Sequence, residues 1–154
     1  MAELESLSHS GICVGDLREA ERFYEEVLGG QVINRVNFNT DDARRGRSVH
    51  SNLVLGDFLF ALMLPKDEMP MPAEDEHRGT NGFRHGFAVS REQFDQIVGR
   101  LRDREIPFEG PINHPEAGPL GESVYFKDPG GNFLEVCWRR DEARPYNPVT
   151  IGEG

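Results

Sequence analysis

Residues 9–30 read HSGICVGDLREAERFYEEVLGG, and this stretch decides the fold because its pattern returns later in the chain. It opens with a half-apolar run that is typical of a β-strand. Asp16 and Glu19 then stand at capping-box spacing, and Gly29-Gly30 ends the run that follows them. The residues between form one apolar stripe of helical period: Leu17, Ala20, Phe23, Tyr24, Val27 and Leu28. The stretch predicts a strand and then a helix.

Residues 84–107, RHGFAVSREQFDQIVGRLRDREIP, repeat this arrangement. Ser90 and Gln93 are the second pair at capping-box spacing, and Pro107 closes the segment. The buried stripe of this helix is predicted to contain Phe94, Ile97, Val98 and Leu101. Self-similarity of this kind sets the architecture of a chain before local propensities do. We therefore expect two modules of the same fold.

Three further strand candidates follow each predicted helix. They are QVINRVNF, SVHSNLVL and DFLFALML in the first half, and FEGPINH, ESVYFKD and NFLEVCW in the second. Each half is thus a βαβββ module, and the fold class is α+β, with a curved mixed sheet and the helices on its outer face. We expect module boundaries at 1–65 and 83–140, an acidic, Pro-rich linker at 66–82, and an irregular tail at 141–154.

Composition excludes several classes of partner. The 154 residues contain 17 Lys and Arg against 27 Asp and Glu, a formal charge of -10, which repels nucleic-acid phosphates and anionic lipids. The N-terminus has no basic or apolar signal region, and the chain has no run of about 18 apolar residues, so we expect a cytoplasmic protein. Cys13 and Cys137 are too few for a disulfide scaffold and are predicted to be buried thiols.

Over residues 7–140 the chain resembles the vicinal-oxygen-chelate superfamily of glyoxalases, bleomycin-resistance proteins and extradiol dioxygenases. The resemblance is most specific in HSGICVGDLREAERFYEEVLG (9–29) and ESVYFKDPGGNFLEVCW (122–138). It implies a divalent metal in the trough formed by paired modules, a small-molecule substrate, and a homodimer. It does not specify the reaction, because one fold hosts many chemistries.

The superfamily pattern maps its metal ligands onto His9 and Glu135. Strand alternation agrees, because Ile12 and Leu134 would face the helices and leave His9 and Glu135 on the trough side. A carboxylate in the middle of an apolar strand costs free energy unless a cation pairs with it. The alternatives are an Arg partner for Glu135 and a structural hydrogen bond for His9.

A second ligand pair is implied for glyoxalases of the usual type. When residues 56–60 are set over 131–135, Phe60 falls on Glu135, so Phe60 is predicted to line the trough as an apolar wall. At most three protein ligands then remain. Two His and one carboxylate with open positions suit Fe(II) or Mn(II).

The third ligand is predicted to be His85. The ungapped repeat alignment places Arg84, not His85, at the position of His9, and alternation then turns His85 toward the helix. A β-bulge at Gly86 would turn His85 into the trough, and we favour that arrangement. The alternative is an ion pair between Arg84 and Glu135 without a metal.

The C-terminal third resembles catechol-type extradiol dioxygenases. This likeness implies that Tyr125 and His114 are catalytic and hydrogen-bond the substrate oxygens, and that the tail ends near 148–150. The acid–base His of that family has no counterpart at its usual place. His50 or His77 could substitute, although neither has matching spacing, and we assign His50 to substrate binding.

ESVYFKDPGGNFLE also resembles the last hairpin of fosfomycin-type thiol transferases, with Ser123, Tyr125 and Glu135 in place and Arg144 where a phosphonate is held. The lysine that those enzymes need is missing from the loop 110–121. A glyoxalase-like lyase and a metal-free protein that sequesters a hydrophobic ligand complete the alternatives. The substrate is expected to be a small aromatic or vicinal-oxygen compound.

Overall fold

The computed structural model describes residues 8–36, 49–64, 84–114 and 121–139. The expected linker and tail, with His77 and Arg144, lie outside these ranges. Along the described residues the elements are β1 (His9–Cys13), α1 (Leu17–Leu28), β2 (Gln31–Val36), β3 (His50–Leu55), β4 (Phe58–Met63), β5 (His85–Val89), α3 (Arg91–Asp103), β6 (Phe108–His114), β7 (Gly121–Lys127) and β8 (Phe133–Arg139).

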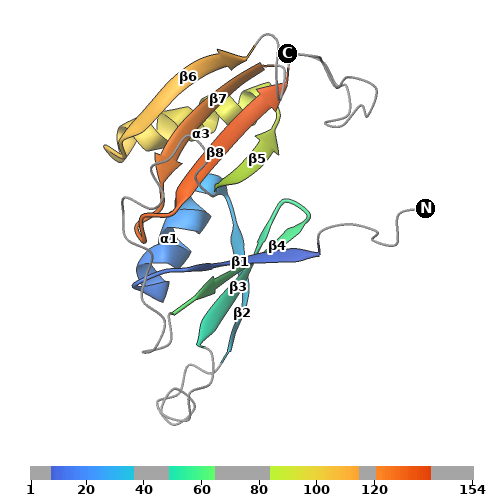
Figure 1. Cartoon of the computed structure of the whole chain (residues 1–154), viewed down its shortest axis with the longest axis vertical. Helices are drawn as coiled ribbons and strands as arrows, with labels where there is room; N and C mark the ends of the chain where they lie inside the picture. Colours follow the sequence, from blue (N-terminus) through green and yellow to red (C-terminus); the bar gives the residue numbers. More distant parts are fainter. Residues whose placement is uncertain (1–7, 37–48, 65–83, 115–120, 140–154) are drawn as a thin grey trace, which may run out of the picture. The chain divides into compact units, whose positions relative to one another are not determined.

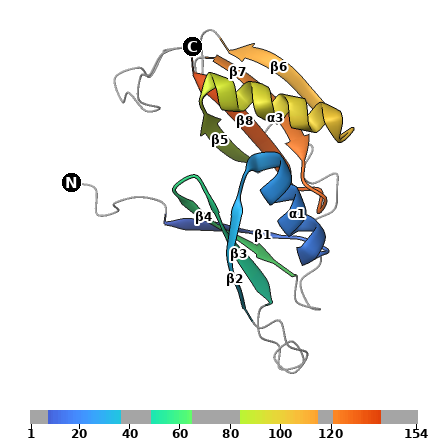
Figure 2. The ribbon, with the colours of Figure 1, turned by 180° about the vertical axis from the view of Figure 1, so that it is seen from behind.

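The elements form two βαβββ modules, which confirms the α+β prediction (Figure 1). Their sheets have the strand orders β1-β4-β3-β2 and β5-β8-β7-β6. The first strand of each module pairs in parallel with the last one, β1 with β4 and β5 with β8. Helix α1 packs on β2, β3 and β4, and in Figure 2 α3 lies along one face of its own sheet. The repeat seen in the sequence is therefore a structural repeat.

The chain separates into two compact units, which do not follow the modules completely. Unit 1 contains residues 1–84 and also 127–133, while unit 2 contains residues 85–126 and 134–154. The turn between β7 and β8 therefore belongs to unit 1, although both strands belong to the second module. Among the described helices, none is both long and apolar enough to span a membrane.

Both helices begin where the sequence predicts, and α1 also ends there, whereas α3 ends at Asp103, before the predicted stop at Pro107. The Asp16 carboxylate accepts hydrogen bonds from the backbone N–H groups of Arg18 and Glu19, at 2.8 and 2.9 Å. Helix α1 ends at Gly29, whose φ of 73° lies in the left-handed region that favours glycine. Ser90 and Gln93 form a complete capping box on α3. Local sequence signals thus mark the starts of both helices, and the packing of their apolar faces stabilises them.

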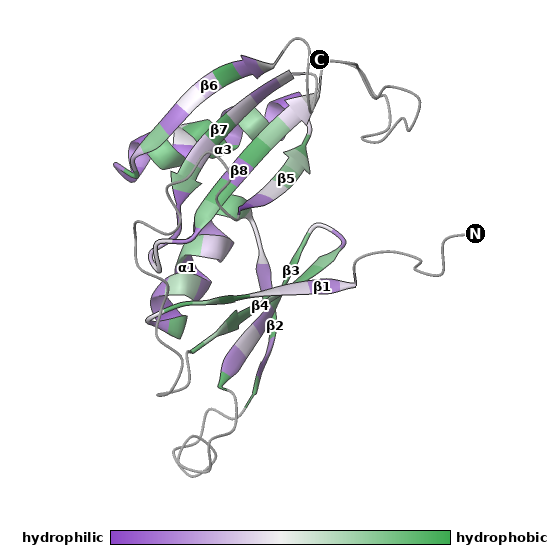
Figure 3. Cartoon of the chain, viewed as in Figure 1, coloured by the Kyte–Doolittle hydropathy of each residue, from purple (hydrophilic) through white to green (hydrophobic). Residues whose placement is uncertain are grey.

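The core of each unit lies between its helix and its sheet. Strands β4 and β8 are largely hydrophobic in Figure 3. Fully buried apolar side chains come from both layers of each unit, namely Ala20, Tyr24, Leu53, Phe60, Leu62, Leu101, Val124, Leu134 and Val136. One buried carboxylate crosses the layers of unit 1: Glu21 of α1 accepts hydrogen bonds from Arg35 and Ser51.

The turn Asp128–Asn132 is held firmly within unit 1. The Tyr24 hydroxyl of α1 donates to Asp128 Oδ2 at 2.9 Å, and Asn132 Nδ2 donates to the Cys13 carbonyl of β1 at 2.9 Å. Asn132 N–H also donates to Asp128 Oδ1 at 2.8 Å. Burial raises the pKa of Asp128, and burial together with the charge of Asp128 raises the pKa of Tyr24. These bonds fix the turn that leads into β8.

Candidate functional site

In unit 1, the contacts of α1 show which face of the sheet meets the helix. The Phe60 and Tyr24 rings lie 5.4 Å apart, and Phe60 stands opposite Ser10 in the ladder between β1 and β4. Alternation leaves the other side chains on what we call the open face of unit 1: His9, Gly11 and Cys13 of β1, His50, Asn52 and Val54 of β3, and Leu59, Ala61 and Met63 of β4.

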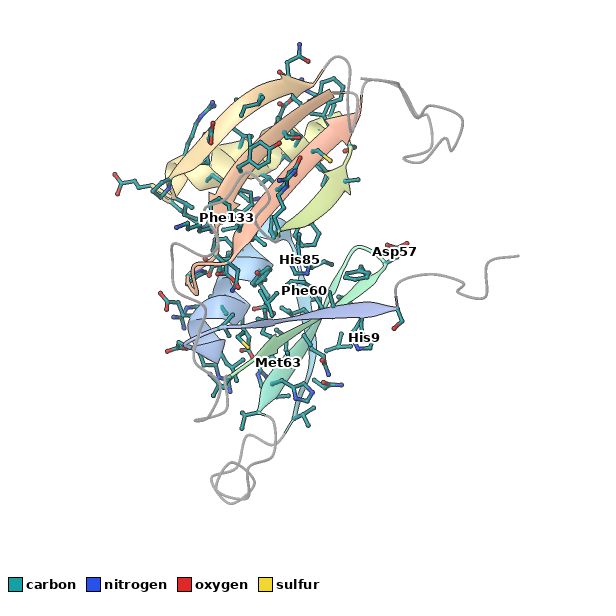
Figure 4. All side chains as sticks on the ribbon, viewed as in Figure 1. His9, Asp57, Phe60, Met63, His85 and Phe133 are labelled. Atoms are coloured by element: carbon teal, nitrogen blue, oxygen red, sulfur yellow. The ribbon has the colours of Figure 1, made fainter. Side chains whose placement is uncertain are left out.

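His9 lies on this open face at the start of β1, as strand alternation predicts (Figure 4). Its ring nitrogen Nδ1 is 2.7 Å from Ser8 Oγ, and the side chain is exposed. Ile12 and Val14, by contrast, are buried. The imidazole is therefore accessible to a ligand.

In unit 2, Trp138 of β8 shows which face meets α3. The Arg91 guanidinium of α3 lies 4.7 Å from the centre of the Trp138 ring, so Trp138, Val136 and Leu134 face the helix. Glu135 and Cys137 then lie on the open face of unit 2.

Glu135 is the buried carboxylate of this open face. Only 7% of Glu135 is exposed, and its neighbours Leu134 and Val136 are fully buried apolar residues. It stands opposite Gly86 in the ladder between β5 and β8. A Cβ atom added to Gly86 would lie 3.9 Å from Glu135 Oε2, which shows that the carboxylate extends over Gly86. Gly86 therefore presents no side chain to this carboxylate.

The β-bulge expected at Gly86 is absent. The parallel ladder runs without a shift from His85 opposite Leu134 to Val89 opposite Trp138, so His85 shares the helix-facing side of the sheet (Figure 4). Bulges are rare in parallel pairs, and the alternation argument holds here. The assignment of His85 as a metal ligand stays a prediction, but the ladder removes the argument that favoured it.

The placement of Phe60 in the trough was wrong. Phe60 is fully buried against Tyr24 of α1, on the helix-facing side of the sheet (Figure 4). The ladder gives the true equivalence, because Ala61 stands opposite Gly11 as Glu135 stands opposite Gly86. Ala61 therefore occupies the position that corresponds to Glu135.

The error comes from the lengths of two turns. A two-residue turn, Gly56-Asp57, joins β3 to β4, whereas the five residues Asp128–Asn132 join β7 to β8. Aligning the two turns without a gap displaced the following strands by one residue. A shift of one residue exchanges the two faces of a strand.

Strand β7 adds two hydroxyl groups to the open face of unit 2. Val124 and Phe126 are buried, and the Trp138 indole N–H donates to Glu122 at 2.9 Å on the helix-facing side. Ser123 and Tyr125 consequently lie on the same face as Glu135, on the strand beside β8. Among the described residues, Ser123 Oγ has no hydrogen-bond partner although it is fully buried. A buried hydroxyl without a partner is costly and is available to a ligand.

The structure says less about the other predicted site residues. His50 lies on the open face of unit 1, opposite Met63 of β4. His114 is the last residue of β6, and Arg144 falls outside the described ranges. Cys137 is buried as expected, whereas Cys13 is only half-buried. Within the ranges that the structure describes, no three His, Cys, Asp or Glu side chains gather as a metal-binding group.

The sequence argument missed three residues of unit 1 that the fold places near functional positions. Met63 was not considered, although strand alternation from His9 would have placed it on the open face. Asp128 and Asn132, which anchor the turn before β8, have no assigned role in the sequence analysis. Their one sequence signal was the DPGGN segment, whose length differs from the Gly-Asp turn of the first module.

Comparison with known proteins agrees with this fold. The sequence model of the Glyoxalase/Bleomycin resistance protein/Dioxygenase superfamily matches residues 6–136. The chain is 26% identical over 133 residues to glutathione transferase FosA of Serratia marcescens, covering 86% of this chain and 80% of that protein.

Solved structures share the architecture. A glyoxylase/bleomycin resistance protein/dioxygenase domain from Frankia matches with a TM-score of 0.70 and 22% identity, over 93% of this chain and 98% of the other. A glutamate-to-glutamine mutant of the fosfomycin resistance protein FosX from Listeria monocytogenes, complexed with Mn(II) and 1S,2S-dihydroxypropylphosphonic acid, gives a TM-score of 0.65 and 18% identity, over 90% and 95%. Because the family match spans both βαβββ modules, the chain belongs to the Glyoxalase/Bleomycin resistance protein/Dioxygenase superfamily.

Proposed function

We propose that the protein is a divalent-metal-dependent enzyme that adds a nucleophile to a small, oxygen-rich anion such as a phosphonate. His9 and Glu135 are its proposed metal ligands. The observation that carries this proposal is Glu135, a carboxylate only 7% exposed that extends over Gly86 on the open face of unit 2. The resemblance to fosfomycin-type transferases and the relatives FosA and FosX support the reaction class.

The chemistry of the two side chains fits a divalent ion. Carboxylate oxygen together with imidazole nitrogen suits Mn(II) or Fe(II). A divalent ion held there would act as a Lewis acid toward a substrate oxygen. Mn(II) is the better choice, because FosX has been crystallised with Mn(II).

Ser123 and Tyr125 are the proposed substrate-binding groups. The Ser123 hydroxyl is buried without a partner among the described residues, and it shares the open face with Glu135. A substrate oxygen that accepted a hydrogen bond from this hydroxyl would remove the free-energy cost of the unpaired group. The Tyr125 phenol, on the same face, would donate a second hydrogen bond and so orient the substrate.

The dioxygenase interpretation is the weaker choice. FosA is a glutathione transferase and FosX is a fosfomycin resistance protein. Neither of these relatives is named for a catechol substrate. The missing lysine in 110–121 still counts against a complete phosphonate site, so a cation elsewhere, with Arg144 as the candidate, would have to replace it. The expected homodimer remains a prediction.

A metal-free binding protein is the second candidate. The regular ladder that turns His85 to the helix-facing side favours it, because fewer ligands then remain for an ion. Metal analysis separates the two candidates directly, since a sequestering protein would contain no stoichiometric metal.

The test follows fosfomycin by phosphorus NMR with full-length protein, Mn(II) and either glutathione or water as the nucleophile. We expect consumption that requires Mn(II), is lost in Glu135→Gln, and is weakened in Ser123→Ala. Cys137→Ser is a matched control on the same open face. Bound Mn(II) without consumption would overturn the substrate class. Absence of Mn(II) binding would overturn the enzyme proposal itself.

A further inference from the structure

A row of three soft side chains crosses the open face of unit 1. Cys13 stands opposite Met63 in the parallel ladder between β1 and β4, and Met63 stands opposite His50 in the antiparallel ladder between β4 and β3. Neighbouring strands lie about 4.7–4.9 Å apart, and directly opposite side chains of an antiparallel pair have Cβ atoms about 4.5–5.5 Å apart. All three residues are half-buried, so a solute can reach them.

The Met63 side chain leans toward β1. A Cβ atom added to Gly11 would lie 2.9 Å from Met63 Cε and 3.7 Å from Met63 Sδ. The thioether therefore lies over Gly11, two residues before Cys13 on the same face of β1. A side chain at position 11 would make the end of the Met63 side chain move.

Backbone hydrogen bonds hold the three strands together at this row. Val14 N–H donates to the Met63 carbonyl at 2.9 Å, and Leu64 N–H donates to the Val49 carbonyl at 3.0 Å. The side chain of Asn132 also holds the Cys13 carbonyl, at 2.9 Å. The backbone at Cys13, Met63 and His50 is thus fixed, and only their side chains need to rotate to meet a common ligand.

We propose that Cys13, Met63 and His50 bind one Cu(I) ion on the open face of unit 1. Thiolate and thioether sulfur select soft ions, and imidazole completes a three-ligand set that Cu(I) accepts. The row contains no carboxylate, which disfavours Mn(II), and a structural Zn(II) site would need a fourth ligand. On binding, the Cys13 thiol forms a sulfur–copper bond and releases its proton to solvent, with no change in oxidation state.

This site differs from the proposed enzyme site in its metal and in its ligands, and it shares only the open face of unit 1 with His9; His50 is also the residue that the sequence assigns to substrate binding. It uses neither His9 nor Glu135, and it lies within a single unit. Failure of one proposal therefore leaves the other standing.

The test is an anaerobic titration of the full-length protein with Cu(I) against the chromogenic chelator bicinchoninate. We expect one tightly held Cu(I), loss of that binding in Cys13→Ser, and about tenfold weaker binding in Met63→Leu, because a thioether is the weakest of the three ligands. Cys137→Ser is the matched control and should bind as the wild type does. Copper X-ray absorption should show two sulfur scatterers and one imidazole.

Tight Cu(I) binding that survives Cys13→Ser would overturn the site, and so would Cu(I) binding that is lost in Cys137→Ser. Because Met63→Leu keeps the side-chain volume, its folding is expected to be intact, and thermal unfolding checks this. Unchanged Cu(I) affinity in a folded Met63→Leu protein would also contradict the proposed ligand set.

Discussion

The same position of the ladder holds Ala61 in the first module and Glu135 in the second. Each stands opposite a glycine on the open face, Gly11 or Gly86. The backbone is therefore repeated while the chemistry is not, because at this position only the second module has a buried carboxylate. The repeat explains the fold, and the difference at this one position points to the site.

The largest loss of stability is expected when a carboxylate is introduced on the helix-facing side of β4 and not on its open face. Phe60→Glu would bury a charge against Tyr24 of α1, and we expect it to cost about 4 kcal/mol or more of unfolding free energy. Ala61→Glu, one residue later, would place its carboxylate on the open face, opposite Gly11, and should cost clearly less. Chemical denaturation of both variants measures the difference. Equal destabilisation would contradict the assignment of the two faces.

The two hairpin turns offer the next comparison. Asp128 is 4% exposed and accepts hydrogen bonds from Tyr24 and Asn132, so Asp128→Ala leaves buried donors without a partner and should cost about 3 kcal/mol. Asp57, in the two-residue turn of the first module, is exposed, and Asp57→Ala should change stability by about 0.5 kcal/mol or less. Thermal unfolding of the pair checks this. A small effect at Asp128 would show that the turn is not an anchor.

A smaller effect on the unfolding free energy is expected when the carboxylates at equivalent positions of the two helices are neutralised. Glu21 lies five residues after the N-cap of α1; burial alone would raise its pKa, but hydrogen bonds from Arg35, Ser51 and Arg18 lower it from 4.5 to about 2. Both arginines are partly exposed, and solvent screening reduces the stabilisation to about 2 kcal/mol.

Because the folded-state pKa is the lower one, this stabilisation is present above pH 4.5 and is lost as the pH falls toward 2. Glu21→Gln should remove that part of the pH dependence of the unfolding free energy. The counterpart in α3 is Asp95, whose exposed carboxylate pairs only with exposed Arg91 in the described contacts, and Asp95→Asn should change little. An unaltered pH profile in Glu21→Gln would refute the network.

Much of this molecule could be predicted from its sequence, because the signals are local. The caps at Asp16 and Ser90 and the apolar stripes behind them define both helices, and alternation placed His9 and Glu135 correctly. The incorrect predictions concern the register of one strand against its neighbour. Phe60 was misplaced because turn length is not encoded in the strand pattern, and His85 was turned to the wrong face by a bulge that the ladder does not contain.

Contacts between segments that are distant in the sequence could not be predicted, for a similar reason. The hydrogen bond from Tyr24 to Asp128 joins residues 104 positions apart, and no periodic pattern links them. The row formed by Cys13, Met63 and His50 depends on the pairing of three strands, which a single sequence does not specify.

The central claim is that Glu135 is a metal ligand, and Mn(II) binding by wild type and Glu135→Gln tests it most directly. Electron paramagnetic resonance of free Mn(II), measured during titration of each protein, gives both affinities. We predict one bound ion in the wild type and an Mn(II) affinity reduced by at least about 100-fold in Glu135→Gln, with thermal unfolding showing that the variant is folded. Equal Mn(II) affinity in the two proteins would contradict the account.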